Sequence, residues 1–155
     1  MKHRADGRAA AVALALGLMP AGCATRTHLA PVDLAAPGWS VTETAAAWRP
    51  RTGAPEFVGE LTVAKHSAGS CWVQFSKQGL PVVTAQLATN GWQISSALRA
   101  GVFLGRLPPP RALWFQIDGA PPLRPPQPPW HLATNSGNWR LTNDRTGESL
   151  EGAFN

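Results

Sequence analysis

The sequence lacks several residue types and patterns that chemistry at a protein site usually needs. Its 155 residues include no tyrosine, two cysteines and four histidines, and only 15% are charged. His28, His66 and His131 do not stand at metal-ligand spacing from one another or from a cysteine, so we predict no metal site. There is no Gly-x-Ser-x-Gly elbow and no glycine-rich loop that leads into a helix.

No other sequence pattern in the chain identifies catalytic residues. His66-Ser67 and Ser70-Cys71 fall in one predicted hairpin loop, where a histidine beside a serine is usually only solvated. The acidic residues lie mostly in predicted turns or on polar strand faces, and nothing marks a glycosidase-type pair. We therefore predict no enzyme activity and no cofactor.

The positive charge is partly a property of the N-terminus. The whole chain has a formal net charge of +5, whereas the residues after Gly22 carry 11 Lys and Arg against 8 Asp and Glu, a net charge of +3. These cations are scattered and form no stripe, so we predict no nucleic-acid partner.

The N-terminus has the layout of a secretory signal peptide. A basic head at residues 2–8 precedes an apolar run from Ala9 to Met19, and small residues follow up to Cys23. The apolar run is too short for a membrane-spanning helix, which needs about 20 residues. The sequence therefore predicts an exported protein.

Ala21 and Gly22, directly before Cys23, resemble the lipobox of bacterial lipoproteins. The resemblance implies a signal peptide over residues 1–22 and acylation of Cys23, by palmitate and related chains, which would anchor the protein to a membrane. Ala24, rather than Asp, fits retention in the outer membrane, facing the periplasm, by the sorting pattern of that family. The alternative is an ordinary signal peptide cleaved near Ala24.

The second cysteine has no evident partner if Cys23 is acylated. We expect Cys71 to be a buried thiol that packs as a small apolar side chain. A Cys23–Cys71 disulfide is the competing interpretation, and it requires that Cys23 carry no lipid.

The rest of the chain divides into a tether and one domain. Residues 23–38 contain two prolines and little periodicity, which is typical of a flexible tether. Residues 39–155 suit a single β domain. At its start, Ser40–Glu43 could form a capping box that opens a helix, but the alternation of Trp39 and Val41 with polar residues favours a strand.

Alternating apolar residues predict strands over Gly59–Lys65 and Ser70–Ser76. Asn90-Gly91 predicts a two-residue type I′ turn between strands at Val82–Thr89 and Trp92–Ser96. This register pairs Thr89 with Trp92 and Leu87 with Ile94. It places Val83, Ala85, Leu87, Trp92 and Ile94 on one face.

Prolines interrupt the pattern between residues 107 and 130. We predict one or two helical turns after Pro110, with Leu113, Trp114 and Ile117 facing one way, and an extended connection over Ala120–Pro129. Three further strands follow, which place on one face Trp130, Leu132, Trp139, Leu141, Leu150 and Phe154. About seven or eight strands indicate a mainly β fold, a curved antiparallel sheet or incomplete β-barrel with one or two short helical segments.

Tryptophan is the abundant aromatic residue, with seven in the chain. In a small β domain these side chains either fill the core and decorate interfaces or line an open concave face that holds an acyl chain. In the second case the lining would consist of Val63, Val73, Phe75, Val83, Leu87 and Ile94, with Trp114 near the mouth.

Several stretches between residues 57 and 155 resemble the LolA/LolB class of periplasmic and outer-membrane lipoprotein carriers. They include Gly-Glu-Leu-Thr-Val at 59–63, Val-Gln-Phe-Ser at 73–76, the Gly-Leu-Pro loop at 79–81, Val-Thr-Ala-Gln-Leu-Ala-Thr-Asn-Gly-Trp-Gln-Ile at 83–94 and Trp-Arg-Leu-Thr-Asn at 139–143. The resemblance implies an incomplete barrel closed by short helices, with residues 110–117 as a closing helix. It also implies an apolar cavity for acyl chains.

In the outer-membrane branch of that class, an exposed leucine on a loop inserts into the membrane, and Leu80 in the loop 77–81 occupies the comparable place. The sequence therefore predicts an anchored lipoprotein that binds lipid or lipoprotein acyl chains, with a periplasmic protein as a further partner. The alternative is a non-carrier lipoprotein that acts as a docking adaptor for another protein.

Overall fold

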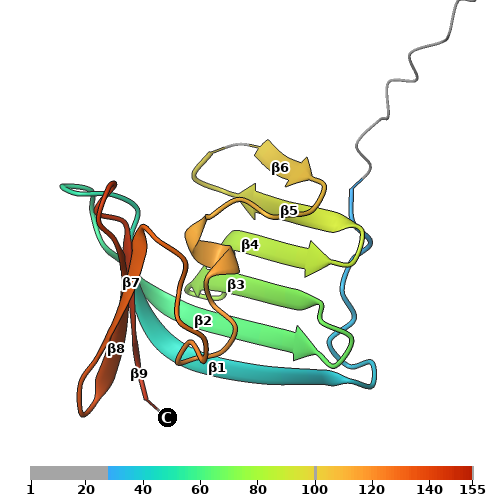
Figure 1. The fold of residues 1–155 in the computed structure, drawn as a ribbon, viewed down its shortest axis with the longest axis horizontal. Coiled ribbons are helices and arrows are strands. Elements are labelled where there is room, and N and C mark those ends of the chain that lie inside the picture. Colours follow the sequence, from blue (N-terminus) through green and yellow to red (C-terminus); the bar gives the residue numbers. More distant parts are fainter. Residues whose placement is uncertain (1–27, 100, 155) are drawn as a thin grey trace, which may run out of the picture.

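One curved antiparallel sheet makes up most of the protein. The structure is a computed structural model, and it describes residues 28–99 and 101–154. Nine strands in these residues follow the order β6-β5-β4-β3-β2-β1-β9-β8-β7 (Figure 1). The sheet does not close into a barrel, since β6 and β7 form its two ends. The predicted mainly β fold is confirmed.

The elements, in chain order, are β1 (Trp39–Arg49), β2 (Phe57–His66), β3 (Cys71–Lys77), β4 (Leu80–Ala88), β5 (Gly91–Ser96), β6 (Gly101–Gly105), the 3-10 turn η1 (Leu113–Phe115), β7 (Trp130–Thr134), β8 (Asn138–Asn143) and β9 (Ser149–Ala153). Residues 39–49 form strand β1, so the strand predicted at the start of the domain is confirmed and the alternative helix is not formed. Strand β6 was not predicted.

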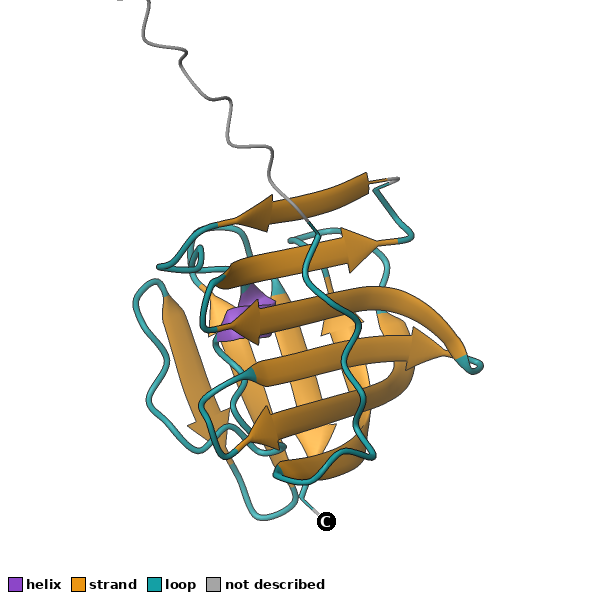
Figure 2. Ribbon diagram, turned by 90° about the vertical axis from the view of Figure 1, so that its right-hand side faces the viewer, coloured by secondary structure: helices purple, strands orange, loops and turns teal. Residues whose placement is uncertain are grey.

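Strand β1 joins two halves of the sheet. It pairs with β2 from Trp39 to Trp48, but only Ala46–Arg49 pair with β9. Because β9 takes only this last part of β1, strands β7–β9 turn away and run steeply past the end of strands β1–β6 (Figure 1). The 3-10 turn η1 lies inside the angle between the halves (Figure 2).

The core fills this angle with aromatic and aliphatic side chains. Trp48 of β1 contacts Trp114 of η1 edge to face, with ring centroids 5.0 Å apart, and it contacts Phe75 of β3 at 5.8 Å. Leu113, Trp114 and Ile117 are all buried, as the helical-turn prediction requires.

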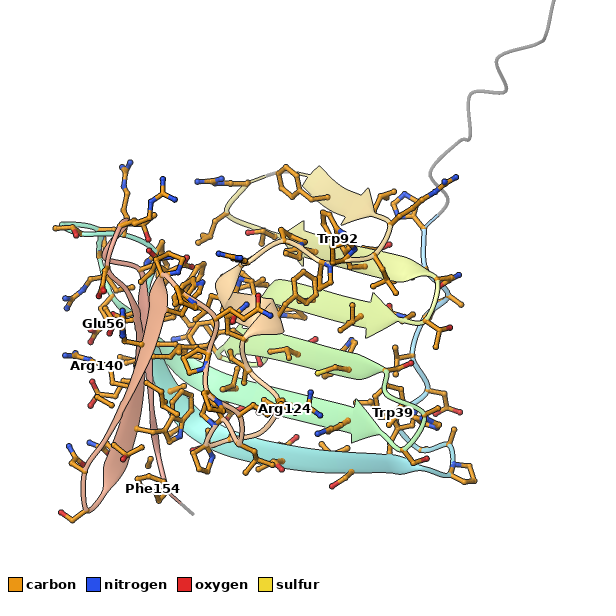
Figure 3. All side chains as sticks on the ribbon, viewed as in Figure 1. Trp39, Glu56, Trp92, Arg124, Arg140 and Phe154 are labelled. Atoms are coloured by element: carbon orange, nitrogen blue, oxygen red, sulfur yellow. The ribbon has the colours of Figure 1, made fainter. Side chains whose placement is uncertain are left out.

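The C-terminal strands bury the face that was predicted, with one exception. Trp130, Trp139, Leu141 and Leu150 are buried, and Leu132 packs against them. Phe154 is instead 39% exposed, because β9 ends at Ala153 and the side chain lies past the end of the strand (Figure 3).

The hairpin between β4 and β5 corrects the predicted register. Ala88 pairs with Gly91 and Leu87 with Trp92, so Thr89 and Asn90 form the turn. Neither Asn90 nor Gly91 has the positive φ that a type I′ turn needs. The predicted inner-face residues of β4 and β5 still share one face. The actual register differs from the predicted one by two residues, and side chains alternate between the faces with a period of two.

Gly91 is explained by a neighbouring strand rather than by a turn. A Cβ atom at this position would lie 2.5 Å from the carbonyl oxygen of Gly105, the last residue of β6. The turn with two positive φ values is instead Gln78-Gly79, at 53° and 77°, between the paired residues Lys77 and Leu80. Strands β3 and β4 are thus joined by the tight turn that was expected between β4 and β5.

Replacing Gly79 with valine should lower the free energy of unfolding by about 1–3 kcal/mol, the scale of local backbone strain. A β-branched residue strongly disfavours a φ of 77°. Urea denaturation measures the loss. Gly137→Val is the matched control, because Gly137 has no positive φ and no atom within 4 Å of its would-be Cβ. Equal losses in both variants would contradict the turn assignment.

Residues 28–38 run along the outer face of the sheet (Figure 2). The Leu29 amide donates to Gln93 Oε1 (3.1 Å), Gln86 Nε2 donates to the Ala30 carbonyl (3.0 Å), and His66 Nε2 lies 3.2 Å from the Pro37 carbonyl. The segment expected to be a tether is therefore docked from residue 28 onward. The predicted signal peptide and Cys23 lie outside the described residues.

Candidate acyl-binding cavity

A cavity of about 480 Å³ lies beside η1, between the two halves of the sheet. Its floor is formed by Val83 of β4 together with Trp92 and Ile94 of β5. The lining also includes Ala112 and Trp114, next to Trp48 of β1 and Glu148 of the β8–β9 turn, and the rings of Trp48 and Trp114 are in contact. Leu98, Arg99 and Phe103, from the β5–β6 turn and β6, also line it, as do Pro50, Ser96 and Pro110.

The structure places only part of the predicted lining at this cavity. Val83, Ile94 and Trp114 line it. Val63, Val73 and Phe75 do not line it, and they pack in the filled core, where they are at most 2% exposed. Trp114 covers that part of the concave face, with its ring centroid 6.3 Å from that of Phe75.

Leu87 is also displaced from the predicted site. It shares the inner face with Ile94 but pairs with Cys71 on one side and Trp92 on the other, and it does not line the cavity. The cavity therefore occupies one end of the concave face rather than its whole length.

Trp92 links β5 to the connection that follows β6 at this end of the sheet (Figure 3). Its indole N–H donates to the Arg106 carbonyl at 2.9 Å, and its ring contacts Phe115 with centroids 5.9 Å apart. A Cβ on Gly105 would lie 2.6 Å from the Trp92 ring, so a glycine is needed where β6 crosses it. These contacts hold β6 and the following connection beside the cavity.

Sequence reasoning missed five lining residues with evident roles: Trp48, Leu98, Arg99, Phe103 and Glu148. The short apolar stretch Val102–Leu104 between two glycines was a usable signal for β6. Glu148 and Arg99 come from turns 49 positions apart, and no local pattern joins them.

Glu148 is the half-buried acid of the cavity. Its Oε1 accepts a hydrogen bond from the Trp48 indole N–H at 3.1 Å. Burial raises the pKa of the Glu148 carboxyl above its ordinary value, while the Trp48 hydrogen bond and the positive charge of Arg99 act in the opposite direction. The cavity is thus lined mostly by apolar side chains, with Glu148, Arg99 and Ser96 as its polar residues.

Replacing Glu148 with glutamine should stabilise the protein increasingly as the pH rises. Because the folded-state pKa is raised, the protonated carboxyl is the form that favours folding. That contribution is present at acid pH and is lost as the pH rises through the raised value. Urea denaturation across this range should show variant and wild type converging at low pH. A difference that is constant with pH would contradict the assignment.

Cys71 is half-buried and packs against the core. Burial, with a smaller effect of Asp118, raises the pKa of its thiol to about 11, so the thiol stays protonated at neutral pH. The alternative disulfide with Cys23 lies outside the described residues.

Leu80 lies at the tip of the β3–β4 hairpin and is 71% exposed. The neighbouring Lys77 places its ammonium 5.8 Å from the centre of the Phe57 ring. The membrane-inserting role implied for Leu80 stays a prediction.

Other kinds of site were sought in the described part of the chain. No group of three or more His, Cys, Asp and Glu in residues 28–99 and 101–154 could hold a metal ion. Over the same ranges, no helix is long and apolar enough to span a bilayer.

Known proteins offer no match. No family model matches the chain, and no match was found among curated proteins or solved structures. The candidate site is therefore argued from its own residues.

Proposed function

We propose that this protein is a lipid-anchored envelope lipoprotein whose cavity binds an acyl chain, and that it acts in the localisation of outer-membrane lipoproteins. The observation that carries the proposal is the apolar cavity between β4–β6, η1 and the β8–β9 turn. Its volume of about 480 Å³ lies within the range of about 300–1,000 Å³ that is usual for small-molecule sites.

The chemistry of the lining favours a chain-like apolar ligand. Aromatic and aliphatic side chains surround most of the space, so affinity would come from apolar burial at about 25 cal/mol per Å², less the cost of association. Arg99 is the cation at the cavity and suits a ligand whose polar end carries negative charge or carbonyl oxygens. A uniformly polar ligand would leave its own groups unpaired there.

The remaining parts of the proposal concern the membrane. Acylated Cys23 would hold the protein on the outer membrane, facing the periplasm. Leu80 would insert from the exposed β3–β4 tip, as the resemblance to the LolA/LolB class implies. A lipoprotein delivered by a periplasmic partner would be the source of the acyl chain.

Uptake of a fluorescent fatty-acid probe by purified wild-type protein tests the cavity, and native mass spectrometry of the same preparation tests for co-purified lipid. We expect saturable probe binding with a blue-shifted emission. Folded protein that binds no probe and carries no lipid would contradict the carrier function.

A second function is favoured by one observation. Val63, Val73 and Phe75 are buried in a filled core, so more of the concave face is packed than an open carrier needs. This packing suits a non-carrier adaptor that docks another protein, and the negative outcome of the probe experiment would support it.

A further inference from the structure

We infer that the protein approaches the membrane with the β6 end of its sheet, and that its cavity opens toward an anionic lipid surface there. The inference deepens the proposed function and rests on it for the anchor at Cys23. The surface concerned, the β6 edge surface, consists of Leu98, Arg99, Val102, Phe103, Arg106 and Leu107.

The β6 edge surface gathers exposed apolar side chains at the end of the sheet. Strand β6 pairs with β5, and no other strand of the described residues follows it in the sheet (Figure 1). Leu98, Val102, Phe103 and Leu107 are 42–50% exposed. Such a concentration along one edge strand is unusual for a surface that meets only water.

The directions of these side chains favour an edge-on approach. Phe103 pairs with Ile94 on the inner face, whereas Val102 pairs with Ser95 and points to the outer face. Both side chains can touch a flat membrane surface only if the edge of the sheet, rather than either of its faces, points toward that surface.

Charge complementarity identifies the partner as an anionic bilayer. Residues 61–117 contain no Asp or Glu, while they contain five cations: Lys65, Lys77, Arg99, Arg106 and Arg111. Arg99 and Arg106 flank β6. Glu148 is the acid that faces Arg99 across the cavity, and it is half-buried and bonded to Trp48. Exposed arginines beside apolar side chains are the combination that binds an anionic lipid surface.

The course of the N-terminal segment places the anchor near this edge. Leu29 is bonded to Gln93 of β5, and Gln93 pairs with Leu104 of β6. His28 is five positions after Cys23, and such a segment spans at most about 17 Å when fully extended. An acyl chain on Cys23 therefore keeps β5 and β6 close to the bilayer.

The cavity and the edge share residues. Leu98, Arg99 and Phe103 belong to both, and a second groove along β6 is lined by Trp92, Val102 and Arg106, among others. With the edge on the membrane, an acyl chain passes between bilayer and cavity without crossing bulk water.

Flotation with vesicles tests the inference. The full chain with Cys23→Ser, which lacks the thiol of the predicted lipidation site, is mixed with vesicles of phosphatidylethanolamine and phosphatidylglycerol, or of phosphatidylcholine alone. Val102→Glu/Arg106→Glu alters the edge at two residues that do not line the cavity. Val41→Glu/Arg145→Glu is the matched control, since Val41 (44%) is as exposed as Val102 (42%) and the change in net charge is the same.

We expect the edge variant to bind anionic vesicles at least about tenfold more weakly than the parent, and the control to stay within about twofold. All variants keep the same N-terminus, so the difference reports on the edge. Equal losses in both variants, or none in the edge variant, would overturn the inference. So would failure of the parent to prefer anionic vesicles, which would point to an acidic protein surface instead.

Two further measurements separate this inference from the proposed function and from misfolding. Fatty-acid probe uptake without vesicles should be equal in the parent and the edge variant. Vesicle binding without probe uptake would support membrane binding by the β6 edge surface and contradict acyl binding in the cavity. Probe uptake without vesicle binding would contradict only membrane binding by the β6 edge surface. If circular dichroism shows that the edge variant is unfolded, Arg106→Glu against Arg145→Glu repeats the comparison with single changes.

Discussion

Replacing Trp139 with alanine is expected to lower the free energy of unfolding by about 3–5 kcal/mol. Trp139 of β8 is the largest of the fully buried side chains, and it belongs to the hydrophobic core. Its removal leaves a cavity that the paired strands β8 and β9 cannot close. Domains of this kind are marginally stable, so the loss should be evident as a lower midpoint in urea denaturation.

The neighbouring glycine gives a sharper version of the same test. Gly152 pairs with Trp139, and a Cβ there would lie 2.5 Å from the indole ring. Gly152→Ala should therefore be strongly destabilising alone and much less so when Trp139 is already leucine. A double-mutant cycle measures this coupling. Additive losses would show that the ring does not require the glycine.

The second large effect is the loss of ligand uptake when the cavity is altered. Ile94→Glu places a carboxylate on its apolar floor, where an unpaired charge is costly and would draw in water. Ala112→Trp leaves the polarity unchanged but fills the space with an indole ring. We expect both variants to lose fatty-acid probe binding.

Two controls match these changes. Val58→Glu introduces the same charge at a residue that is 65% exposed, and Ala133→Trp adds the same ring at an exposed position of β7. Both should bind the probe as wild type does. If Ala112→Trp is folded, as judged by circular dichroism, and retains full uptake, the ligand binds elsewhere.

The strands were largely predictable because alternation is a local property. Residues 59–65 and 70–76 repeat apolar and polar side chains with a period of two, and the structure has strands there. The β4–β5 turn was misplaced because Asn90-Gly91 is a strong local signal. The actual reason for Gly91 is the close carbonyl of Gly105, a contact between strands that no local pattern reveals.

The cavity was predictable only in part for a related reason. The period of two correctly placed Val83 and Ile94 on the inner face. It could not show how deeply Trp114 packs, and that depth decides that Val63, Val73 and Phe75 belong to the core. The position of Glu148 at the cavity depends on how far β1 bends, and that bend is a property of the whole sheet.

The bend of β1 has a consequence for which ligands fit. The floor of the cavity belongs to one half of the sheet, whereas Trp48 and Glu148 stand where the other half begins. Strand β1 pairs with both halves, and its pairing with β9 starts within the small residues Ala45–Ala47. The distance from this floor to Trp48 and Glu148 would therefore follow the curvature of a strand whose alanines do not line the cavity. Selectivity for chain length would change with substitutions at those alanines, while every residue in contact with the ligand stayed the same.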